Sequence, residues 1–176
     1  MVKIREIEAS EYNNAVKDVV SKALGITYAE SVQSLNKPDS VLLVAETDDS
    51  VVGFACGYNS DNPEEYIKSL GNIGGNSILE KIAVLPEYRG QGVGTELYRK
   101  RLEKLNQPTI AESWIRTDSP DSTILLENFG FEQIQLIENK WYEESIEARD
   151  ENFCPDCGEV CRCDSAIYIL ENFEAD

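Results

Sequence analysis

The stretch Leu79–Leu105, LEKIAVLPEYRGQGVGTELYRKRLEKL, contains the features on which the fold depends. Its first apolar run ends at Pro86, which cannot extend a strand ladder. Three glycines follow at positions 90, 92 and 94 and remove side chains where the chain turns. The pattern then becomes helical, so a helix begins immediately after the glycine-rich loop. The unpaired N–H groups and the positive dipole end of this helix therefore adjoin a loop with few side chains. This combination predicts an anion cradle, best suited to a phosphate or pyrophosphate.

Two familiar phosphate-binding loops do not fit this stretch. A Walker loop ends in Gly-Lys-Ser/Thr, whereas this loop ends in Gly94-Thr95-Glu96. A dinucleotide fingerprint has the spacing G-x-G-x-x-G, and here the spacing is G-x-G-x-G, with no short strand-helix-strand unit opening the chain. The alternative is a glycine-rich turn without a ligand, so the glycines alone do not define a binding site.

Length and composition indicate a single globular domain. The chain has 176 residues, of which 41% are hydrophobic, and this is enough for a sizeable core. No apolar run is long enough to span a membrane, and the N-terminal MVKIREIEAS lacks the apolar centre of a secretory signal. We therefore expect a cytoplasmic protein without a membrane partner.

The charge balance is strongly acidic. Thirty-three acidic residues outnumber 16 basic ones, which gives a net charge of −17, and the chain has no histidine. Such a charge repels nucleic acid and anionic membranes, and it fits either life at high salt or a cationic substrate. The absence of histidine excludes a Ser-His or Cys-His nucleophile pair and any histidine metal ligand.

The hydrophobic patterns predict a mixed α/β order. Strands are expected over residues 2–7, 41–46, 51–58, 78–85, 111–117, 131–142 and 166–173. Helices are expected over 10–25, 28–35, 63–70, 95–105 and 121–129, the first with Ser10 as N-cap and Gly25 as its stop. Residues 143–164 are predicted to form an irregular, cysteine-rich insertion between the last two strands.

The segment Val84–Gly94, VLPEYRGQGVG, resembles the central motif of the GNAT family of N-acetyltransferases, in which Arg/Gln-x-x-Gly-x-Gly/Ala follows a V-x-P strand end. Arg89, Gly92 and Gly94 occupy the fixed positions. Leu125–Phe131, LLENFGF, resembles the helix ending in Gly-Phe that closes the acetyl-CoA site of the family. The resemblance covers nearly the whole chain. It implies one domain over 1–176 with a mixed, mostly antiparallel sheet of about six to seven strands, flanked by helices and splayed between two parallel central strands.

The resemblance also implies an activity and a cofactor site. Acetyl-CoA would bind between the strands 78–85 and 111–117, and a primary amine of a small molecule or protein would attack its thioester directly in a ternary complex. The residues implied in cofactor binding are Ile82, Ala83 and Val84 for the pantetheine arm, Arg89, Gly90, Gln91, Gly92, Val93, Gly94 and Thr95 for the pyrophosphate, and Ser119. The backbone N–H of Val84 is the candidate that steadies the thioester oxygen. Ser119 stands where the family often has an asparagine that contacts CoA, but it also reads as a helix N-cap.

The proton chemistry departs from the family pattern. Many members carry a tyrosine as general acid where this chain has Leu126, which cannot donate a proton. We predict Glu80 as the catalytic base, because a partly buried glutamate can be tuned toward neutral pH. The alternatives are that Glu80 pairs with Lys81 or faces water, or that water relays the proton. Tyr142 and Glu112 are weaker candidates for the base.

A second group of residues has metal-binding chemistry. Cys154, Cys157, Cys161 and Cys163 follow the spacing C-x2-C-x3-C-x-C, and four thiolates this close suit a tetrahedral zinc ion. Cys157-Gly158 resembles a zinc knuckle, and a cytosolic setting disfavours disulfides. The last spacing is tighter than usual, and a redox pair or idle cysteines are the alternatives. We predict a structural zinc site that staples the insertion and could shape acceptor choice or support a homodimer.

Three function classes remain open on the sequence alone. They are an acetyl-transferring enzyme, an acyl-CoA-binding protein that has lost catalysis, and a zinc-bearing interaction module. The motif favours the first two, and the enzyme leads because other family members work without the tyrosine. The acceptor is not defined: the loops 25–39 and 61–76 contain Glu30, Asp61, Glu64 and Glu65, which would suit a cationic amine or form ordinary surface. A nucleic-acid partner is not expected.

Overall fold

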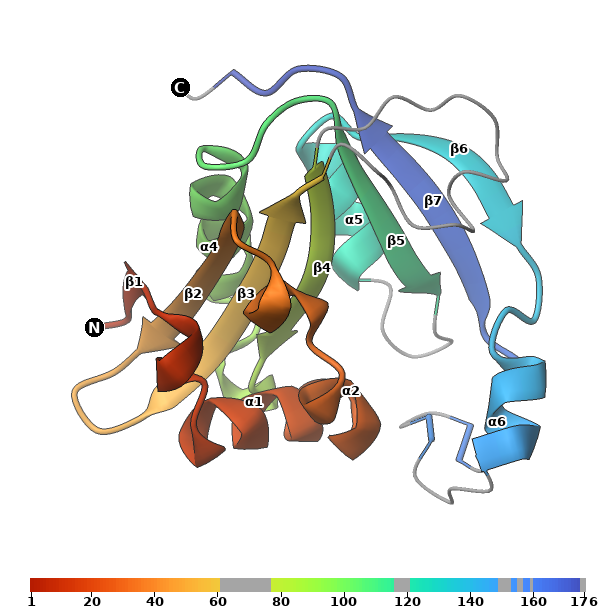
Figure 1. Cartoon of the computed structure of the whole chain (residues 1–176), viewed down its shortest axis with the longest axis horizontal. Helices are drawn as coiled ribbons and strands as arrows, with labels where there is room; N and C mark the ends of the chain where they lie inside the picture. Colours follow the sequence, from red (N-terminus) through yellow and green to blue (C-terminus); the bar gives the residue numbers. More distant parts are fainter. Residues whose placement is uncertain (61–76, 116–120, 149–152, 155–156, 159, 175–176) are drawn as a thin grey trace.

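The computed structural model describes residues 1–60, 77–115, 121–148, 153–154, 157–158 and 160–174. These residues form a seven-stranded sheet with the order β1-β2-β3-β4-β5-β7-β6 (Figure 1). The strands are β1 (Lys3–Glu6), β2 (Ser40–Glu46), β3 (Val51–Asn59), β4 (Ser77–Val84), β5 (Thr109–Ile115), β6 (Glu132–Ile137) and β7 (Asp164–Leu170). Only the central pair β4–β5 is parallel, and every other neighbouring pair is antiparallel. The predicted mixed, mostly antiparallel sheet is therefore confirmed.

Helices cover both faces of this sheet (Figure 1). On one face lie α1 (Asn14–Leu24), α2 (Ile26–Glu30) and the 3-10 turn η2 (Gln33–Asn36), and on the other lie α4 (Val93–Leu102) and α5 (Asp121–Asn128). Helix α6 (Tyr142–Ala148) follows β6 near the cysteine-bearing segment. Two further 3-10 turns are η1 (Ala9–Glu11) and η3 (Pro86–Tyr88).

The core has two layers because β2 and β3 are buried on both faces. Leu42 and Val44 pack with residues of α1, whereas Leu43 and Ala45 pack with residues of α4. The unbroken apolar run of β2 is what a strand covered on both sides requires. Two layers of helices thus fix the central strands that carry the site.

The sheet opens between β4 and β5. These strands pair only over Ser77–Leu79 and Thr109–Ala111, and no pairing is recorded beyond that point. Along β3, Cys56 lies opposite Lys81 while Gly57 lies opposite Leu79, so Glu80 is an extra residue and forms a β-bulge. Bulges bend a strand and increase its twist, and this one is located where β4 leaves β5. The resemblance predicts a splayed sheet, and the β-bulge at Glu80 is the distortion of β4 that lies where the splay begins.

A buried arginine stabilises the bulge from the α4 side. Arg101 is 1% exposed, and its Nη1 donates to the carbonyl oxygens of Cys56 and Lys81 at 2.7 and 2.8 Å. Its guanidinium also lies over the Tyr98 ring, 4.6 Å from the ring centre. Burial lowers the pKa of Arg101, and the nearby tyrosine, cysteine and glutamate offset only part of this effect. Gly57 is required beside it, because a Cβ there would lie 2.6 Å from the Ile78 carbonyl oxygen.

Two expected helices are wrong in detail. The N-cap of α1 is Asn13, whose Oδ1 accepts from Ala15 N at 3.0 Å and Val16 N at 3.4 Å, while Ser10 lies in η1. Gly25 ends α1 as expected. The predicted helix 28–35 is two short pieces, α2 and η2.

The predicted long strand 131–142 ends at Ile137. Asn139 then has a positive φ of 49°, and the chain continues into α6. Helix α6 occupies the start of the insertion predicted to be irregular. The helix expected over 63–70 lies outside the described residues.

Candidate functional site

A cavity of about 390 Å³ lies at the opening of the sheet, on the side of the glycine loop. Eight residues expected to contact the cofactor line it: Ile82, Ala83, Val84, Arg89, Gly90, Gly92, Gly94 and Thr95. The side chains of Gln91 and Val93 do not line it: that of Gln91 donates to the Glu87 carbonyl oxygen at 2.8 Å, and that of Val93 is buried in the core. The contacts expected of these two residues are through their backbone N–H groups. Ser119 lies outside the described residues. We call this space the cofactor cavity.

The glycine loop meets the requirements of an anion cradle. Gly90 and Gly92 have positive φ values of 69° and 81°, and a Cβ at either residue would meet no atom within 4 Å. Gly92 is the N-cap of α4 and offers no side chain to the N–H groups of the first turn. The first helical hydrogen bond runs from Glu96 N to Gly92 O. An anion at this end of the ten-residue α4 would thus meet open space and unpaired N–H groups.

The backbone of β4 presents polar groups to the opening. Leu85 N donates to Val52 O, which fixes the alternation of the antiparallel ladder between β3 and β4. By this alternation the N–H groups of Ile82 and Val84 point away from β3, toward the gap. The Val84 carbonyl oxygen accepts from Arg89 Nε at 3.0 Å, which ties the loop to the strand end. The predicted role of the Val84 N–H at a thioester oxygen is compatible with this direction.

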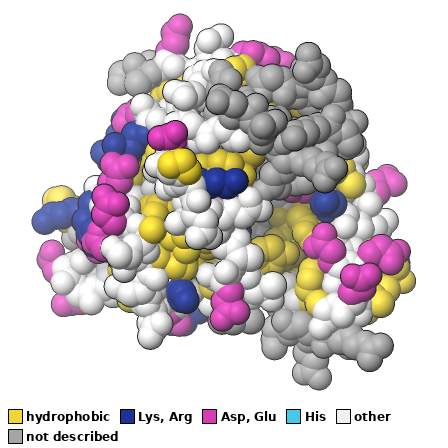
Figure 2. Space-filling view, in the orientation of Figure 1, with side chains coloured by type: hydrophobic (Ala, Val, Ile, Leu, Met, Phe, Trp, Pro, Cys, Tyr) yellow, Lys and Arg dark blue, Asp and Glu magenta, His cyan; other side chains and the backbone are white. Residues whose placement is uncertain are grey.

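A second cavity of about 380 Å³ adjoins the first at the opening, and Leu24, Ile82, Trp114 and Ser122 line both. Its other lining residues include Tyr28, Tyr58, Glu80, Glu112, Trp141 and Glu144. Figure 2 shows a hollow on this face with hydrophobic side chains on its floor and acidic side chains on the α6 side. We call this space the acceptor cavity.

Three aromatic side chains form one boundary of the acceptor cavity. The ring centres of Tyr28 and Trp114 are 5.1 Å apart, and those of Trp114 and Trp141 are 5.0 Å apart. We call these three residues the aromatic wall. Burial, and then the nearby negative charges of which Glu144 is the largest, raise the pKa of Tyr28, so its hydroxyl stays protonated at neutral pH. The sequence analysis missed this wall, because its members come from α2, β5 and the residue before α6.

Glu80 is held in place by hydrogen bonds from η2 and from Lys81. Its carboxylate accepts hydrogen bonds from Gln33 N, Ser34 N and Ser34 Oγ at 2.6 to 2.7 Å, and from Lys81 Nζ at 2.9 Å. Burial acts to raise the pKa of Glu80, but the Lys81 charge and these hydrogen bonds outweigh it and lower the pKa. The expected tuning toward neutral pH is therefore wrong, and the pairing with Lys81 given as the alternative is confirmed. Cys56, as predicted, is a buried core residue beside it, and burial raises its pKa to about 12.

The remaining proton-transfer candidates occupy different places. Glu112 lines the acceptor cavity, and one of its carboxylate oxygens accepts from Ser165 Oγ. The Arg162 guanidinium lies over the Tyr142 ring, 4.9 Å from the ring centre, and Tyr142 lines neither cavity. Leu126 is 1% exposed in the hydrophobic core, so it has only a packing role.

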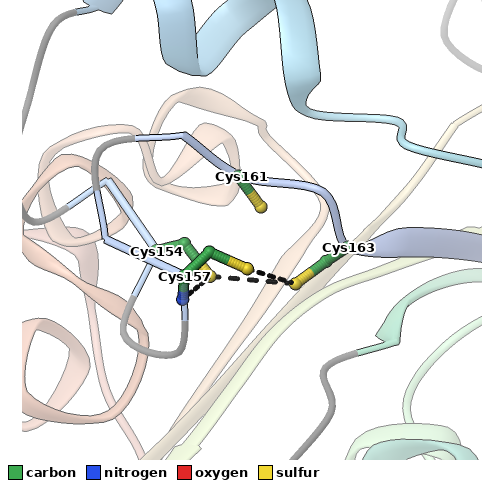
Figure 3. A group of neighbouring side chains, drawn as sticks. All are labelled: Cys154, Cys157, Cys161 and Cys163. Carbon is green, nitrogen blue, oxygen red and sulfur yellow. Dashed lines mark hydrogen bonds between the residues drawn. The ribbon is translucent and has the colours of Figure 1, made fainter.

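The four cysteines of the C-terminal segment come together (Figure 3). Their sulfur atoms all lie within 4.8 Å of one another, and the Cys163 sulfur is 3.8 Å from that of Cys154 and 3.5 Å from that of Cys157. A tetrahedral zinc ion with Zn–S bonds of about 2.3 Å places its sulfurs about 3.8 Å apart. The donor set and its spacing thus fit such an ion. We call these residues the cysteine cluster.

The backbone of the cysteine cluster has a knuckle geometry. Cys157 N donates to the Cys154 sulfur at 3.4 Å, and Gly158 has a positive φ of 77°. Cys154 and Gly158 exchange backbone hydrogen bonds of 3.2 and 2.8 Å. A hydrogen bond from the Arg162 backbone contributes most to lowering the pKa of the exposed Cys157, while burial raises that of Cys163.

Comparison with known proteins identifies the family. The family model described as Acetyltransferase (GNAT) family matches residues 1–131, so this chain belongs to the GNAT family. A protein of Archaeoglobus fulgidus called an uncharacterized N-acetyltransferase is 36% identical over 84 residues, which are 46% of this chain and 52% of that protein. The match thus spans about half the length of this relative. None of the helices in the described part of the chain has the length and apolar content that a membrane crossing requires.

Solved structures share the fold across the whole chain. The ribosomal-protein-S18-alanine N-acetyltransferase of Escherichia coli has a TM-score of 0.65 at 18% identity, covering 100% of this chain and 97% of that one. Arabidopsis thaliana NAA60 in complex with acetyl-CoA has a TM-score of 0.63 at 14% identity, covering 97% and 98%. At these identities the likeness establishes the fold and not the substrate.

Proposed function

We propose that this protein transfers the acetyl group of acetyl-CoA to a primary amine by direct attack in a ternary complex. The observation that carries the proposal is that the cofactor cavity and the acceptor cavity meet where β4 and β5 separate. A glycine cradle at a helix N-terminus lies on one side of this point, and carboxylates and aromatic rings lie on the other. Two substrates held on either side can react without a covalent enzyme intermediate, so positioning supplies much of the rate enhancement.

In this proposal the bound acetyl-CoA supplies the activated acyl group, and the chain positions it. The N–H groups of the first turn of α4 hold the pyrophosphate, with Gly90 and Gly92 allowing close approach. The edge of β4 from Ile82 to Val84 pairs with the pantetheine arm. The Val84 N–H stabilises the negative charge that develops on the thioester oxygen.

Glu112 is the proposed proton acceptor for the amine. It lines the acceptor cavity, and its hydrogen bond from Ser165 fixes one carboxylate oxygen while the other can reach a ligand. Glu112 and Glu144, together with the faces of the aromatic wall, favour an amine that arrives as a cation. Lys81, Arg101 and Lys140 in the same lining supply opposing charges, of which Lys81 is paired with Glu80 and Arg101 is buried.

We also infer that the cysteine cluster binds a structural zinc ion. The observation that supports this is the mutual distance of its four sulfurs, which matches tetrahedral coordination. Four protein ligands would leave no position open for a substrate, so the ion would stabilise structure and take no part in the reaction.

The experiment that tests the acetyl-CoA proposal combines native mass spectrometry with a matched pair of variants. Gly92→Ala and Gly158→Ala both place a Cβ at a similar positive φ, of 81° and 77°, but only Gly92 lines the cofactor cavity. Each should cost about 1 kcal/mol of stability. We expect Gly92→Ala to weaken acetyl-CoA binding at least about tenfold, because its methyl group enters the cradle, and Gly158→Ala to leave it unchanged.

Turnover is then measured with spermidine, lysine and an alanine-ended peptide as acceptors. A one-to-one acetyl-CoA adduct with acetylated product supports the enzyme. An adduct without turnover for any amine would favour an acyl-CoA-binding protein, and equal affinities of the two glycine variants would contradict the cradle.

A further inference from the structure

The aromatic wall and the cysteine cluster share one hydrophobic core. Trp141, Phe153, Cys154, Cys161 and Cys163 are buried against one another, and Trp114 packs on this group. Trp141 is 8% exposed although it lines the acceptor cavity, so most of its surface is covered by protein. The cysteine cluster thus packs behind Trp114 and Trp141, which line part of the acceptor cavity.

A hydrogen-bonded connection links the same two features through α6. The Cys161 N–H donates to Ser145 Oγ at 2.9 Å, and Ser145 is completely buried. Ser145 N in turn donates to the Trp141 carbonyl oxygen at 2.9 Å, and Ser145 Oγ donates to the Tyr142 carbonyl oxygen at 2.8 Å. Ser145 therefore joins the backbone of a cysteine ligand to the first turn of α6, where Trp141 is attached.

We propose that metal bound in the cysteine cluster fixes the position of Trp141, and with it the aromatic wall, so that metal occupancy controls the acceptor cavity. This inference rests on the proposed function, because it assigns the acceptor to that cavity. Trp141 is then a specificity-determining residue that contacts the acceptor, and Ser145 is a positioning residue that acts through it. Without metal, the four cysteines, whose sulfurs lie within 4.8 Å of one another, lose the metal–sulfur bonds that hold them together. The packing of the cysteine cluster against the two tryptophans of the aromatic wall then loosens.

The cofactor cavity should not share this dependence. No member of the cysteine cluster lines it, and its walls come from β4, the glycine loop, α1 and α5. Trp114 of β5 borders both cavities, and the pairing of β5 with β7 along Thr109–Ile115 holds its backbone in the sheet. The structure therefore predicts that metal removal affects one cavity and spares the other.

The chain provides its own spectroscopic probe for this test. It has two tryptophans, Trp114 and Trp141, and both belong to the aromatic wall. Intrinsic tryptophan fluorescence consequently reports on the wall, and it is measured without acetyl-CoA because Trp114 also borders the cofactor cavity. The full-length zinc-loaded protein is stripped with a chelator, and emission, acrylamide quenching and acetyl-CoA affinity by calorimetry are measured before and after.

We expect one zinc ion per chain, a red-shifted emission and several-fold stronger quenching after stripping, all reversed when zinc is restored. The acetyl-CoA dissociation constant should change less than about twofold, which is within the ordinary scatter of an unaffected site. Emission and quenching that do not change on stripping would overturn the proposal. So would a purified protein that binds no zinc, or a loss of acetyl-CoA affinity as large as the change in the wall.

A matched pair of variants tests the connection without altering a metal ligand. Ser145→Ala removes the acceptor of the Cys161 N–H, and the loss of a hydrogen bond that holds a metal ligand in place weakens metal binding by about tenfold or more. Glu147→Ala changes an exposed residue of the same helix and should leave zinc affinity unchanged. Zinc affinity and emission that are equal in the two variants would contradict the assigned role of Ser145. Failure of acetyl-CoA to bind either protein would instead count against the proposed function.

Discussion

The largely buried ion pair of Glu80 and Lys81 shows what a single residue contributes to this fold. The carboxylate joins the β4 bulge to η2 through Gln33 and Ser34, and its side chain is 10% exposed. Removing one partner of a buried pair leaves the other charge uncompensated, which costs far more than the pair itself contributes. Glu80 therefore stabilises the shape of the opening, and its chemistry is that of a structural carboxylate.

Glu80→Gln should accordingly lower the free energy of unfolding by about 3 kcal/mol at neutral pH. Because the pKa of Glu80 is lowered on folding, its stabilisation is fully present above the ordinary glutamate pKa of about 4.3 and is lost as the pH falls through the folded pKa. The loss of unfolding free energy in Glu80→Gln should thus become smaller as the pH falls below the folded pKa of Glu80. Glu46→Gln, which weakens the more exposed pair with Arg5, is the control and should cost only about 0–1 kcal/mol. Denaturant unfolding at several pH values measures both, and equal losses would show that Glu80 is not a structural anchor.

The proton acceptor gives a second prediction at the same scale. Glu112→Gln should reduce kcat by about 100-fold or more, with acetyl-CoA affinity retained. Glu80→Gln, measured below its unfolding temperature, should lower kcat by less than about tenfold. A loss of kcat in Glu80→Gln that exceeds the loss in Glu112→Gln would favour Glu80 as the base.

At the residue scale, sequence reasoning succeeds where chemistry is local. Gly90 and Gly92 need no distant partner to be recognised as cradle residues, because their conformations are set by the loop itself. The same holds for Cys154 and Cys157, three residues apart. Glu80 could not be assigned in this way, since its hydrogen-bond donors come from Gln33 and Ser34, which are more than 40 residues away.

At the scale of an element, helix α1 depends on one cap. Asn13 accepts from two N–H groups of the first turn, whereas Ser10 belongs to η1 three residues earlier. Asn13→Ala should cost about 1 kcal/mol of unfolding free energy, and Ser10→Ala should cost less than about 0.5 kcal/mol. Urea denaturation compares the two directly. A larger loss for Ser10→Ala would reverse the assignment of the cap.

Elements were predicted well where periodicity and stop signals agree, and poorly where they conflict. Strand β2 lies close to its expected range because it is apolar throughout and bounded by turns. In the last quarter of the chain, the pattern of alternating residues continues past Ile137, and the turn at Asn139 with its positive φ contains no glycine or proline that would indicate it. The aromatic wall was missed for a related reason, since three separate elements supply its members.

The net charge of −17 is a property of the whole molecule, and no single ion pair neutralises it. Like charges on a compact surface repel one another and favour the unfolded chain, in which they lie farther apart. Salt shortens the range of this repulsion, from about 30 Å at 0.01 M to about 10 Å at 0.1 M ionic strength. The protein should therefore gain stability as sodium chloride increases, although its surface ion pairs weaken under the same conditions.

Raising sodium chloride from low to moderate concentration should increase the unfolding free energy by about 1 kcal/mol, or the Tm by about 2–4 °C for a chain of this size. Calorimetry across a salt series measures the effect, with sucrose at matched osmolality as the uncharged control. A variant with Glu138, Glu143, Glu147 and Glu171 changed to Gln, all exposed residues, should be more stable at low salt and should gain less from added salt, because less repulsion remains to be screened. A Tm that falls with salt would mean that attractive pairs such as Arg5–Glu46 outweigh the net repulsion, and the acidic surface would then need another explanation, such as the attraction of a cationic acceptor.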